Sequence, residues 1–169
     1  MPLVKIDENT LDALKSADTS DHGKVLNLGK SLAQAVAEEA GQQPYLVPIG
    51  ERAEAILDSY DERQLSTQKA LKELERLVAE FVQARKEREM TGFDLNTFTI
   101  YWVLKQAGLP EADKFAPMLN ATFGRFPNHA HNVTELRQLK AETYKVLLPA
   151  VGTERMVELA ERIFRLERK

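Results

Sequence analysis

Two histidines in the C-terminal half of the chain have a spacing that suits metal binding. His129 and His131 form an H-x-H pair, and Glu135 follows shortly after them. Imidazole nitrogens and carboxylate oxygens are the zinc ligands that remain in a protein without cysteine. No fourth ligand stands nearby in the sequence. We therefore predict a surface or capping role for these residues, and no metal site.

Three carboxylates form the second group that could do chemistry. Glu51, Glu54 and Asp58 recur at steps of three and four residues, so a helix would place them on one face. Neighbouring carboxylates can act as a general acid and a general base. However, Arg52 and Arg63 stand among them, and nothing in the pattern predicts a desolvated face. We predict solvated ion pairs here and no catalytic site.

The tripeptide Gly29-Lys30-Ser31 is the third candidate, because it matches the end of a phosphate-binding loop. That loop needs a further glycine at position 24, where this chain has Lys24, and it follows a strand, which is not expected here. We predict instead a helix whose glycine lies where a neighbour approaches closely. No serine stands in a G-x-S-x-G pattern either. The sequence therefore predicts no catalytic residue and no bound cofactor.

Composition indicates a soluble intracellular protein. The chain has 169 residues, enough for one domain with a core, and no cysteine, as is common in the reducing cytoplasm. Its start lacks the pattern of a signal peptide, and no apolar run approaches the roughly 18 residues of a membrane span. The net charge of −3 argues against a dedicated nucleic-acid binder. We expect a cytoplasmic protein without a membrane contact.

The strongest pattern in the chain predicts one long helix over residues 67–90. Ser66 or Thr67 is the expected N-cap, and no helix breaker follows before Thr91 and Gly92. The helix would have about 24 residues. Its apolar band is wider than a coiled-coil seam, so it should pack against more than one neighbour. The band consists of Leu71, Leu74, Leu77, Val78, Phe81 and Val82.

Helical spacing recurs through the rest of the chain. The segment 95–108 is the most aromatic and has β-branched residues that leave a strand possible, but we favour a buried helix ended by Gly108. Trp102 and Tyr101 would then belong to the core, with a role in partner binding as the alternative. Two other expected helices cover residues 7–17 and 21–40. Three more begin near Pro48, Pro110 and Asn132, and the last helix follows Gly152.

These segments predict an all-α fold. We expect an irregular multi-helix bundle of about seven helices around the long helix 67–90, forming a single helical domain over residues 1–169. Pro117 should kink the helix that begins near Pro110, whose inward residues should include Met118. The expected core includes Leu74, Phe81, Trp102, Leu139 and Leu159.

The C-terminal part of the chain is mildly basic. Residues 125–169 contain nine Lys and Arg against six Asp and Glu, so the rest of the chain holds the acidic excess. Cations in this part are candidates for contacts with the phosphates of DNA. They are Arg137, Lys140, Lys145, Arg155, Arg162 and Arg165.

The chain resembles a known protein family over essentially its whole length. It is similar to the C-terminal helical region of the restriction (R) subunit of type I restriction-modification enzymes. The resemblance rests mainly on the segment PYLVPIGERAEAILDSYDERQLSTQKALKELERL, with support from VKIDENTLDALKSAD, GFDLNTFTIYWVLKQAG and ELRQLKAETYKVLLPAVGTERMVELAERIF. Its most telling residues are Pro44, Leu46, Glu51, Arg52, Ala53, Tyr60, Arg63, Gln64, Ser66, Thr67, Ala70 and Leu71, with Glu135, Leu136, Arg137 and Leu139.

The resemblance implies a role in assembly. The R subunit is an ATP-dependent deoxyribonuclease whose nuclease carboxylates, ATP site and Mg site lie in domains upstream of this region. None of those motifs is found here, so no catalytic residue carries over. We expect a C-terminal piece of such a motor subunit, which packs against the motor domains and docks them onto the methyltransferase and specificity subunits. Candidate contacts to these partners are Arg52, Arg63, Glu51 and Glu54.

Two other functions stay open. One is a helical module of the same motor subunit that contacts the DNA backbone through the basic C-terminal residues. The other is a free-standing enzyme that uses the H-x-H loop or the glutamate face. The first predicts binding to DNA that falls steeply with salt, whereas the second predicts a titrating or metal-dependent activity.

Overall fold

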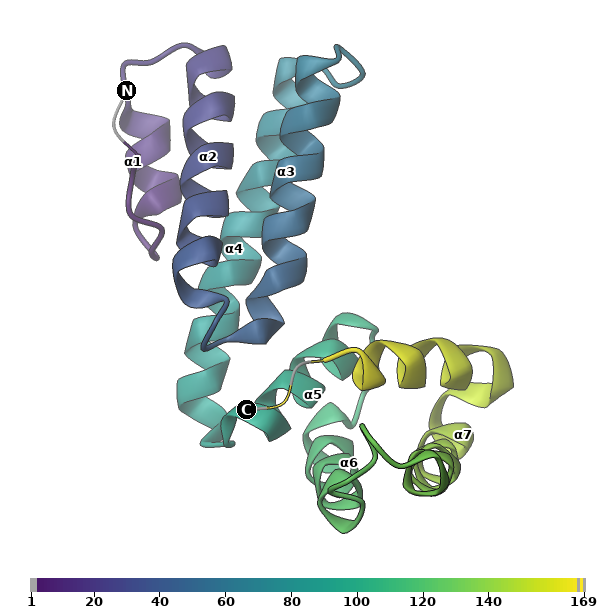
Figure 1. Ribbon diagram of the computed structural model, residues 1–169. Helices are drawn as coiled ribbons and strands as arrows, with labels where there is room; N and C mark the ends of the chain where they lie inside the picture. Colours follow the sequence, from purple (N-terminus) through teal and green to yellow (C-terminus); the bar gives the residue numbers. More distant parts are fainter. Residues whose placement is uncertain (1–2, 167, 169) are drawn as a thin grey trace. The chain divides into compact units, whose positions relative to one another are not determined.

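The computed structural model describes residues 3–166 and residue 168, and within them the chain is all-helical. The described part has seven α-helices, one short 3₁₀ helix and no strand (Figure 1). The all-α fold predicted from the sequence is confirmed. The chain divides into two compact units, Met1–Met90 and Thr91–Lys169, and each is described by itself. The single domain expected over residues 1–169 is not tested by this division and stays a prediction.

Unit 1 contains four α-helices, of which the last is the predicted long one. Serine side chains cap two of these helices at their N-termini. The Ser20 hydroxyl accepts from the Gly23 N–H at 3.1 Å, and the Ser66 hydroxyl accepts from the Lys69 N–H at 3.2 Å. Ser66 therefore caps the long helix. The elements are α1 (Thr10–Ser16), α2 (Asp21–Glu39), the 3₁₀ helix η1 (Pro44–Leu46), α3 (Val47–Asp61) and α4 (Thr67–Thr91).

Helix α1 is shorter than predicted, because a turn replaces its expected first residues. The Asp7 N–H donates to the Thr10 hydroxyl at 2.8 Å, and the Asp7 carboxylate accepts from the Asn9 N–H at 2.9 Å. The Thr10 hydroxyl also donates to the Lys5 carbonyl at 3.0 Å. Such side-chain bonds offer the backbone an alternative to the helix, so the helix begins at Thr10.

Helices α2 and α3 pack closely through two glycines, one on each helix. A Cβ atom at Gly29 would lie 2.7 Å from the Leu57 Cγ, and a Cβ at Gly50 would lie 2.7 Å from the Val36 Cγ1. The two pairs run in opposite directions along the helices, as an antiparallel pair requires. Gly29 therefore has the role predicted for it, a close approach by a neighbouring helix.

Substitution of Gly50 by alanine should destabilise unit 1 by about 1 to 2 kcal/mol, because the new methyl group overlaps a stiff β-branched neighbour. Gly29→Ala should cost less, since Leu57 is only half-buried and can change rotamer. Chemical denaturation of the purified variants measures both values. Gly124→Ala is the control, because no atom lies within 4 Å of a Cβ there and alanine favours a helix. Equal stabilities of Gly50→Ala and Gly124→Ala would contradict the close packing.

The core of unit 1 lies between α2, α3 and α4. Leu74 and Phe81 of α4 are fully buried, as predicted, and α2 contributes Leu28 and Leu32. Near Phe81, the Arg85 guanidinium lies 4.5 Å from the ring centroid, pairs with the Glu39 carboxylate and donates to the Ile6 carbonyl at 3.1 Å. One side chain of α4 thus holds both α2 and the N-terminal segment.

Unit 2 is built around α5 (Leu95–Gln106), whose buried residues cover all of its faces. Eight consecutive residues, Thr97 to Leu104, are buried. The Asp94 carboxylate accepts from the Thr97 N–H at 2.8 Å and is the N-cap. The predicted buried helix is confirmed, and Trp102, with 4% of its surface exposed, is part of the core. Burial on every side outweighs the modest strand preference of the β-branched residues.

Two further helices, α6 (Ala112–Arg125) and α7 (Val133–Phe164), complete unit 2. The prediction for Met118 was wrong: its side chain is 51% exposed, because the buried stripe of α6 runs through Ala112, Ala116, Leu119 and Phe123 and Met118 points away from it. Pro110 lies in the turn before α6 rather than at its first position.

Helix α7 begins and breaks where the sequence predicts. The Asn132 side chain accepts from the Glu135 N–H at 3.0 Å and caps the helix. Gly152 has φ +79° and interrupts the helical backbone, so α7 consists of two helical parts. Leu139 and Leu159, one from each part, are both buried as expected.

Arg168 holds the C-terminal end of the chain onto α6. Its guanidinium lies 4.5 Å from the Phe123 ring centroid and donates to the Asn120 Oδ1 at 2.8 Å. Partial burial lowers the pKa of Arg168, and the charge of Asp94 acts in the opposite direction.

Candidate functional site

The loop between α3 and α4 contains an unusual backbone conformation at one of the predicted contact residues. Arg63 has φ +61°, and it is the one residue other than glycine with positive φ among those that the structure describes. The Gln64 N–H donates to the Ser59 carbonyl at 2.8 Å, and the Arg63 N–H donates to the Tyr60 carbonyl at 3.0 Å. This pattern is a Schellman motif, which usually has glycine at the position that Arg63 occupies.

Arg63 lines a hollow of about 650 Å³ where the ends of three helices meet. Inside it, the Tyr60 hydroxyl lies 2.5 Å from the His22 Nδ1 and 3.0 Å from the Thr67 Oγ1. This chain of hydrogen bonds joins α2, α3 and the start of α4. The other residues that line the hollow are Asp61, Leu65 and Ser66.

A second hollow, of about 450 Å³, lies between α3 and α4 and shares Leu65 with the first. Ile56 and Leu77 give it apolar walls, and Arg52 and Arg76 add two guanidinium groups. Arg52 pairs with the Glu80 carboxylate at 2.8 Å, and its side chain is 54% exposed. An exposed pair of this kind adds little to stability, so it leaves Arg52 able to exchange its partner. The remaining lining residues are Ala55, Ser59 and Glu73.

The structure separates the four predicted contact residues into two pairs. Arg52 and Arg63 line the two adjoining hollows, which we call the α3–α4 surface. Glu51 and Glu54 are exposed on α3 but line neither hollow. The ion pair that Arg52 makes is with α4 and not with the acidic residues beside it in the sequence.

The sequence did not reveal the hydrogen-bond chain in the first hollow. Tyr60 falls in register with the buried residues Ile49 and Ala53 of α3, and it is half-buried. Its hydroxyl partner His22 is 38 residues away, and nothing in the spacing of either residue connects them. Only the packing of α2 beside α3 brings the two side chains together.

Several of the candidate DNA contacts already have partners within unit 2. Lys145 pairs with Glu142 at 3.2 Å, Arg165 pairs with Glu161 at 3.9 Å, and Arg155 donates to the carbonyl of Ala107. Lys140 lies 5.8 Å from the Phe164 ring centroid. Arg137 and Arg162 are exposed and have no acidic partner among the described residues.

The hydrogen bond from Lys145 lowers the pKa of Glu142, and the charges of Lys145 and Arg125 add to this effect. Lys145→Gln should therefore raise the pKa of Glu142 toward its ordinary value, which an NMR titration of the carboxyl carbon measures. Because the pKa is lower in the folded state, the stabilisation is present near neutral pH and is lost as the pH falls through the folded pKa. Lys140→Gln is the control. An unchanged pKa in Lys145→Gln would exclude this pairing in solution.

In the H-x-H loop, contacts with two phenylalanines hold His129 in position. The His129 Nδ1 lies 2.8 Å from the Phe126 carbonyl oxygen, and its ring meets the Phe123 ring edge-on at 5.4 Å between centroids. His131 is exposed. Across residues 3–166 and 168, no group of three His, Asp or Glu side chains is arranged to hold a metal ion.

The comparisons with known proteins give no relative. No protein-family model, no curated protein and no solved structure matches this chain. Among the described residues, no helix combines the length and the apolar character that crossing a membrane requires.

Proposed function

We propose that this chain is the non-catalytic, C-terminal helical assembly domain of the R subunit of a cytoplasmic type I restriction enzyme. It docks the ATP-dependent DNA motor and nuclease onto the core of methyltransferase and specificity subunits. The α3–α4 surface makes the contact to the core. The proposal rests on the sequence resemblance and is supported by the properties of this surface, above all by the backbone conformation of Arg63.

Arg63 supports the proposal because its conformation has a cost that its own contacts do not offset. A residue with a Cβ in the left-handed region is less favourable than glycine by roughly 1 kcal/mol. The Schellman motif uses only the backbone of Arg63, so a glycine would close α3 as well. The side chain has no acidic partner in the described part of the chain. A strained residue of this kind is a reason to infer a function.

The rest of the α3–α4 surface has the composition of an interface. Arg52 and Arg76 stand beside the apolar side chains of Ile56, Leu65 and Leu77. Arginine beside partly buried apolar groups is enriched at the centres of protein interfaces, because the guanidinium can bond carboxylates and carbonyls in a fixed geometry.

The test is binding of the purified chain to a purified methyltransferase and specificity core from the same organism, without DNA and at moderate salt. Arg63→Gly should weaken this binding at least about tenfold, as for the loss of a charged hydrogen bond. The same variant should be as stable as the wild type, or more stable by up to about 1 kcal/mol. This combination separates a binding role from a structural one.

Three further variants sharpen the result. Arg63→Asn tolerates the same backbone conformation without the charge and should behave like Arg63→Gly. Arg63→Lys keeps the charge and should retain part of the binding, while Arg162→Gln removes an exposed arginine of unit 2 and should bind normally. Binding by Arg63→Gly that equals the wild type would overturn the proposed contact. A parent reading frame without upstream nuclease and helicase motifs would overturn the family assignment.

A second candidate function is contact with the DNA backbone by unit 2. It is favoured by Arg137 and Arg162, which are exposed on α7 and have no acidic partner within the described residues. If it holds, duplex DNA binds with an affinity that falls steeply with salt, and each of Arg137→Gln and Arg162→Gln lowers the slope by about one. Core binding that fails while this DNA binding appears would favour the second function over docking.

A further inference from the structure

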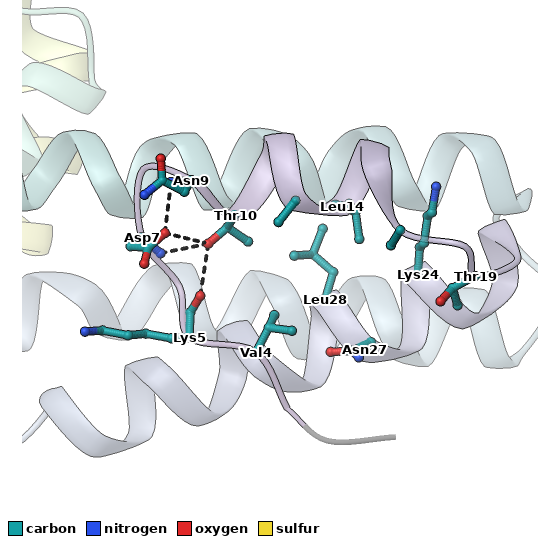
Figure 2. A pocket seen from close by; sticks show the side chains of 12 residues that line it. Val4, Lys5, Asp7, Asn9, Thr10, Leu14, Thr19, Lys24, Asn27 and Leu28 are labelled. Atoms are coloured by element: carbon teal, nitrogen blue, oxygen red, sulfur yellow. Dashed lines mark hydrogen bonds between the residues drawn. The ribbon is translucent and has the colours of Figure 1, made fainter.

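Unit 1 contains a hollow of about 280 Å³ between the N-terminal residues 4–19 and helix α2, and it is separate in its lining from the α3–α4 surface (Figure 2). Its middle is apolar. Leu28 of α2 is fully buried and forms one wall, while Leu14, Ala13 and Ala17 form the wall on the side of α1. Ala13 and Ala17 are exposed, so the hollow can be reached from solvent.

The two ends of this hollow differ in chemistry. Figure 2 shows Lys24 and Thr19 at one end and the turn that contains Asp7, Asn9 and Thr10 at the other, with Leu14 and Leu28 between them. The polar groups of the turn bond to each other, since the Asp7 carboxylate accepts from the Asn9 N–H and the Asp7 N–H donates to Thr10. That end therefore offers little to a ligand.

Lys24 is different, because the residue is half-buried and its ammonium has no acidic partner among the described residues. The Thr19 hydroxyl lies at the same end of the hollow (Figure 2). The other lysine of the lining, Lys5, extends away from the hollow in this view. A single cation and a hydroxyl thus stand at one end of an apolar hollow. This arrangement suits a ligand with one anionic head and an alkyl chain.

We propose that this hollow binds a linear aliphatic monocarboxylate of medium length. The alkyl chain lies between α1 and α2 against Leu14 and Leu28, and the carboxylate accepts hydrogen bonds from the Lys24 ammonium and the Thr19 hydroxyl. Helix α1, from Thr10 to Ser16, is about 10 Å long at the rise of an α-helix, which fits an extended chain such as that of octanoate. This site is independent of the proposed docking function.

The first experiment titrates the purified chain with octanoate, octan-1-ol and octylamine and follows amide resonances by NMR. Octanoate should bind most tightly and octylamine most weakly, because the three probes share the alkyl chain and differ in head-group charge. The shifted resonances should belong to residues 4–28. Equal binding of octanoate and octylamine, or no binding of octanoate, would overturn the proposal.

Two variants test the ends and the middle of the hollow separately. Lys24→Gln should weaken octanoate about tenfold and leave octan-1-ol unchanged, as for one charge-assisted hydrogen bond. Lys15→Gln, which removes a lysine of α1 outside the lining, is the matched control. Ala13→Leu should fill the hollow and abolish binding of both probes while α-helical content stays normal by circular dichroism. A Lys24→Gln effect no larger than that of Lys15→Gln would exclude Lys24 as the head-group partner.

Discussion

Phe98→Ala is expected to destabilise unit 2 by about 4 kcal/mol. Phe98 is completely buried in the first turn of α5, where its ring lies 6.0 Å from the Trp102 ring and 5.5 Å from the Tyr101 ring between centroids. Removing the ring leaves a cavity in the core that surrounds α5. Substitution of a buried phenylalanine by alanine costs about 3 to 5 kcal/mol.

The measurement is hydrogen exchange resolved by peptide, because a chain of two compact units need not unfold in one step. Protection should fall in residues 95–164. Met118→Ala is the control, since its exposed side chain should change stability by less than about 0.5 kcal/mol. A loss of protection no larger than in Met118→Ala would show that Phe98 is not in the core.

Arg85→Met should destabilise unit 1 by about 2 to 3 kcal/mol. Methionine keeps the apolar stem against Phe81 but removes the guanidinium that pairs with Glu39 and bonds the Ile6 carbonyl. The second carboxylate oxygen of Glu39 is already buried without a hydrogen-bond partner, so the change leaves the whole carboxylate unpaired. Because both side chains keep some exposure, the cost should lie somewhat below the roughly 3 to 5 kcal/mol of a broken pair that is fully buried.

Lys86→Met is the matched control on the same helix. Lys86 pairs with Glu8 at 3.6 Å in an exposed position, so its loss should cost no more than about 0.5 kcal/mol. Glu39→Gln should recover part of the stability of Arg85→Met, because it removes the unpaired charge. Peptide-resolved hydrogen exchange over residues 3–90 measures the stability of Arg85→Met, of Lys86→Met and of Arg85→Met combined with Glu39→Gln. Similar losses in Arg85→Met and Lys86→Met would mean that the Arg85 contacts are not formed in solution.

Local features of this chain could be predicted because they depend on neighbouring residues. The caps at Ser66 and Asn132 each use a side chain that bonds an N–H three residues ahead, and the break at Gly152 needs only a glycine. The spacing of apolar residues likewise predicts which face of a helix is buried, as for Leu74 and Phe81 of the long helix.

Features that depend on tertiary contacts could not be predicted. The Arg85 bond to Ile6 joins residues 79 positions apart, and the pair of His22 and Tyr60 joins residues 38 apart. The charge of Arg63 and its place in the resemblance make it a candidate contact. Its positive φ arises because α3 ends in a Schellman motif at this residue, and an arginine in the sequence does not predict such an ending. For the candidate site, the sequence therefore identified two arginines but not the hollows that they line.

The glycine contacts between α2 and α3 also restrict how unit 1 can move. Gly29 faces Leu57 and Gly50 faces Val36, so each helix has its bulky residue opposite the bare backbone of the other. Sliding one helix along the other would bring these bulky residues against other side chains, which a densely packed interface resists. The two helices should therefore move as one rigid hairpin. Any rearrangement of unit 1 on binding a partner must then occur in the loop 62–66 or in the N-terminal segment, and not by a piston motion of α2 against α3.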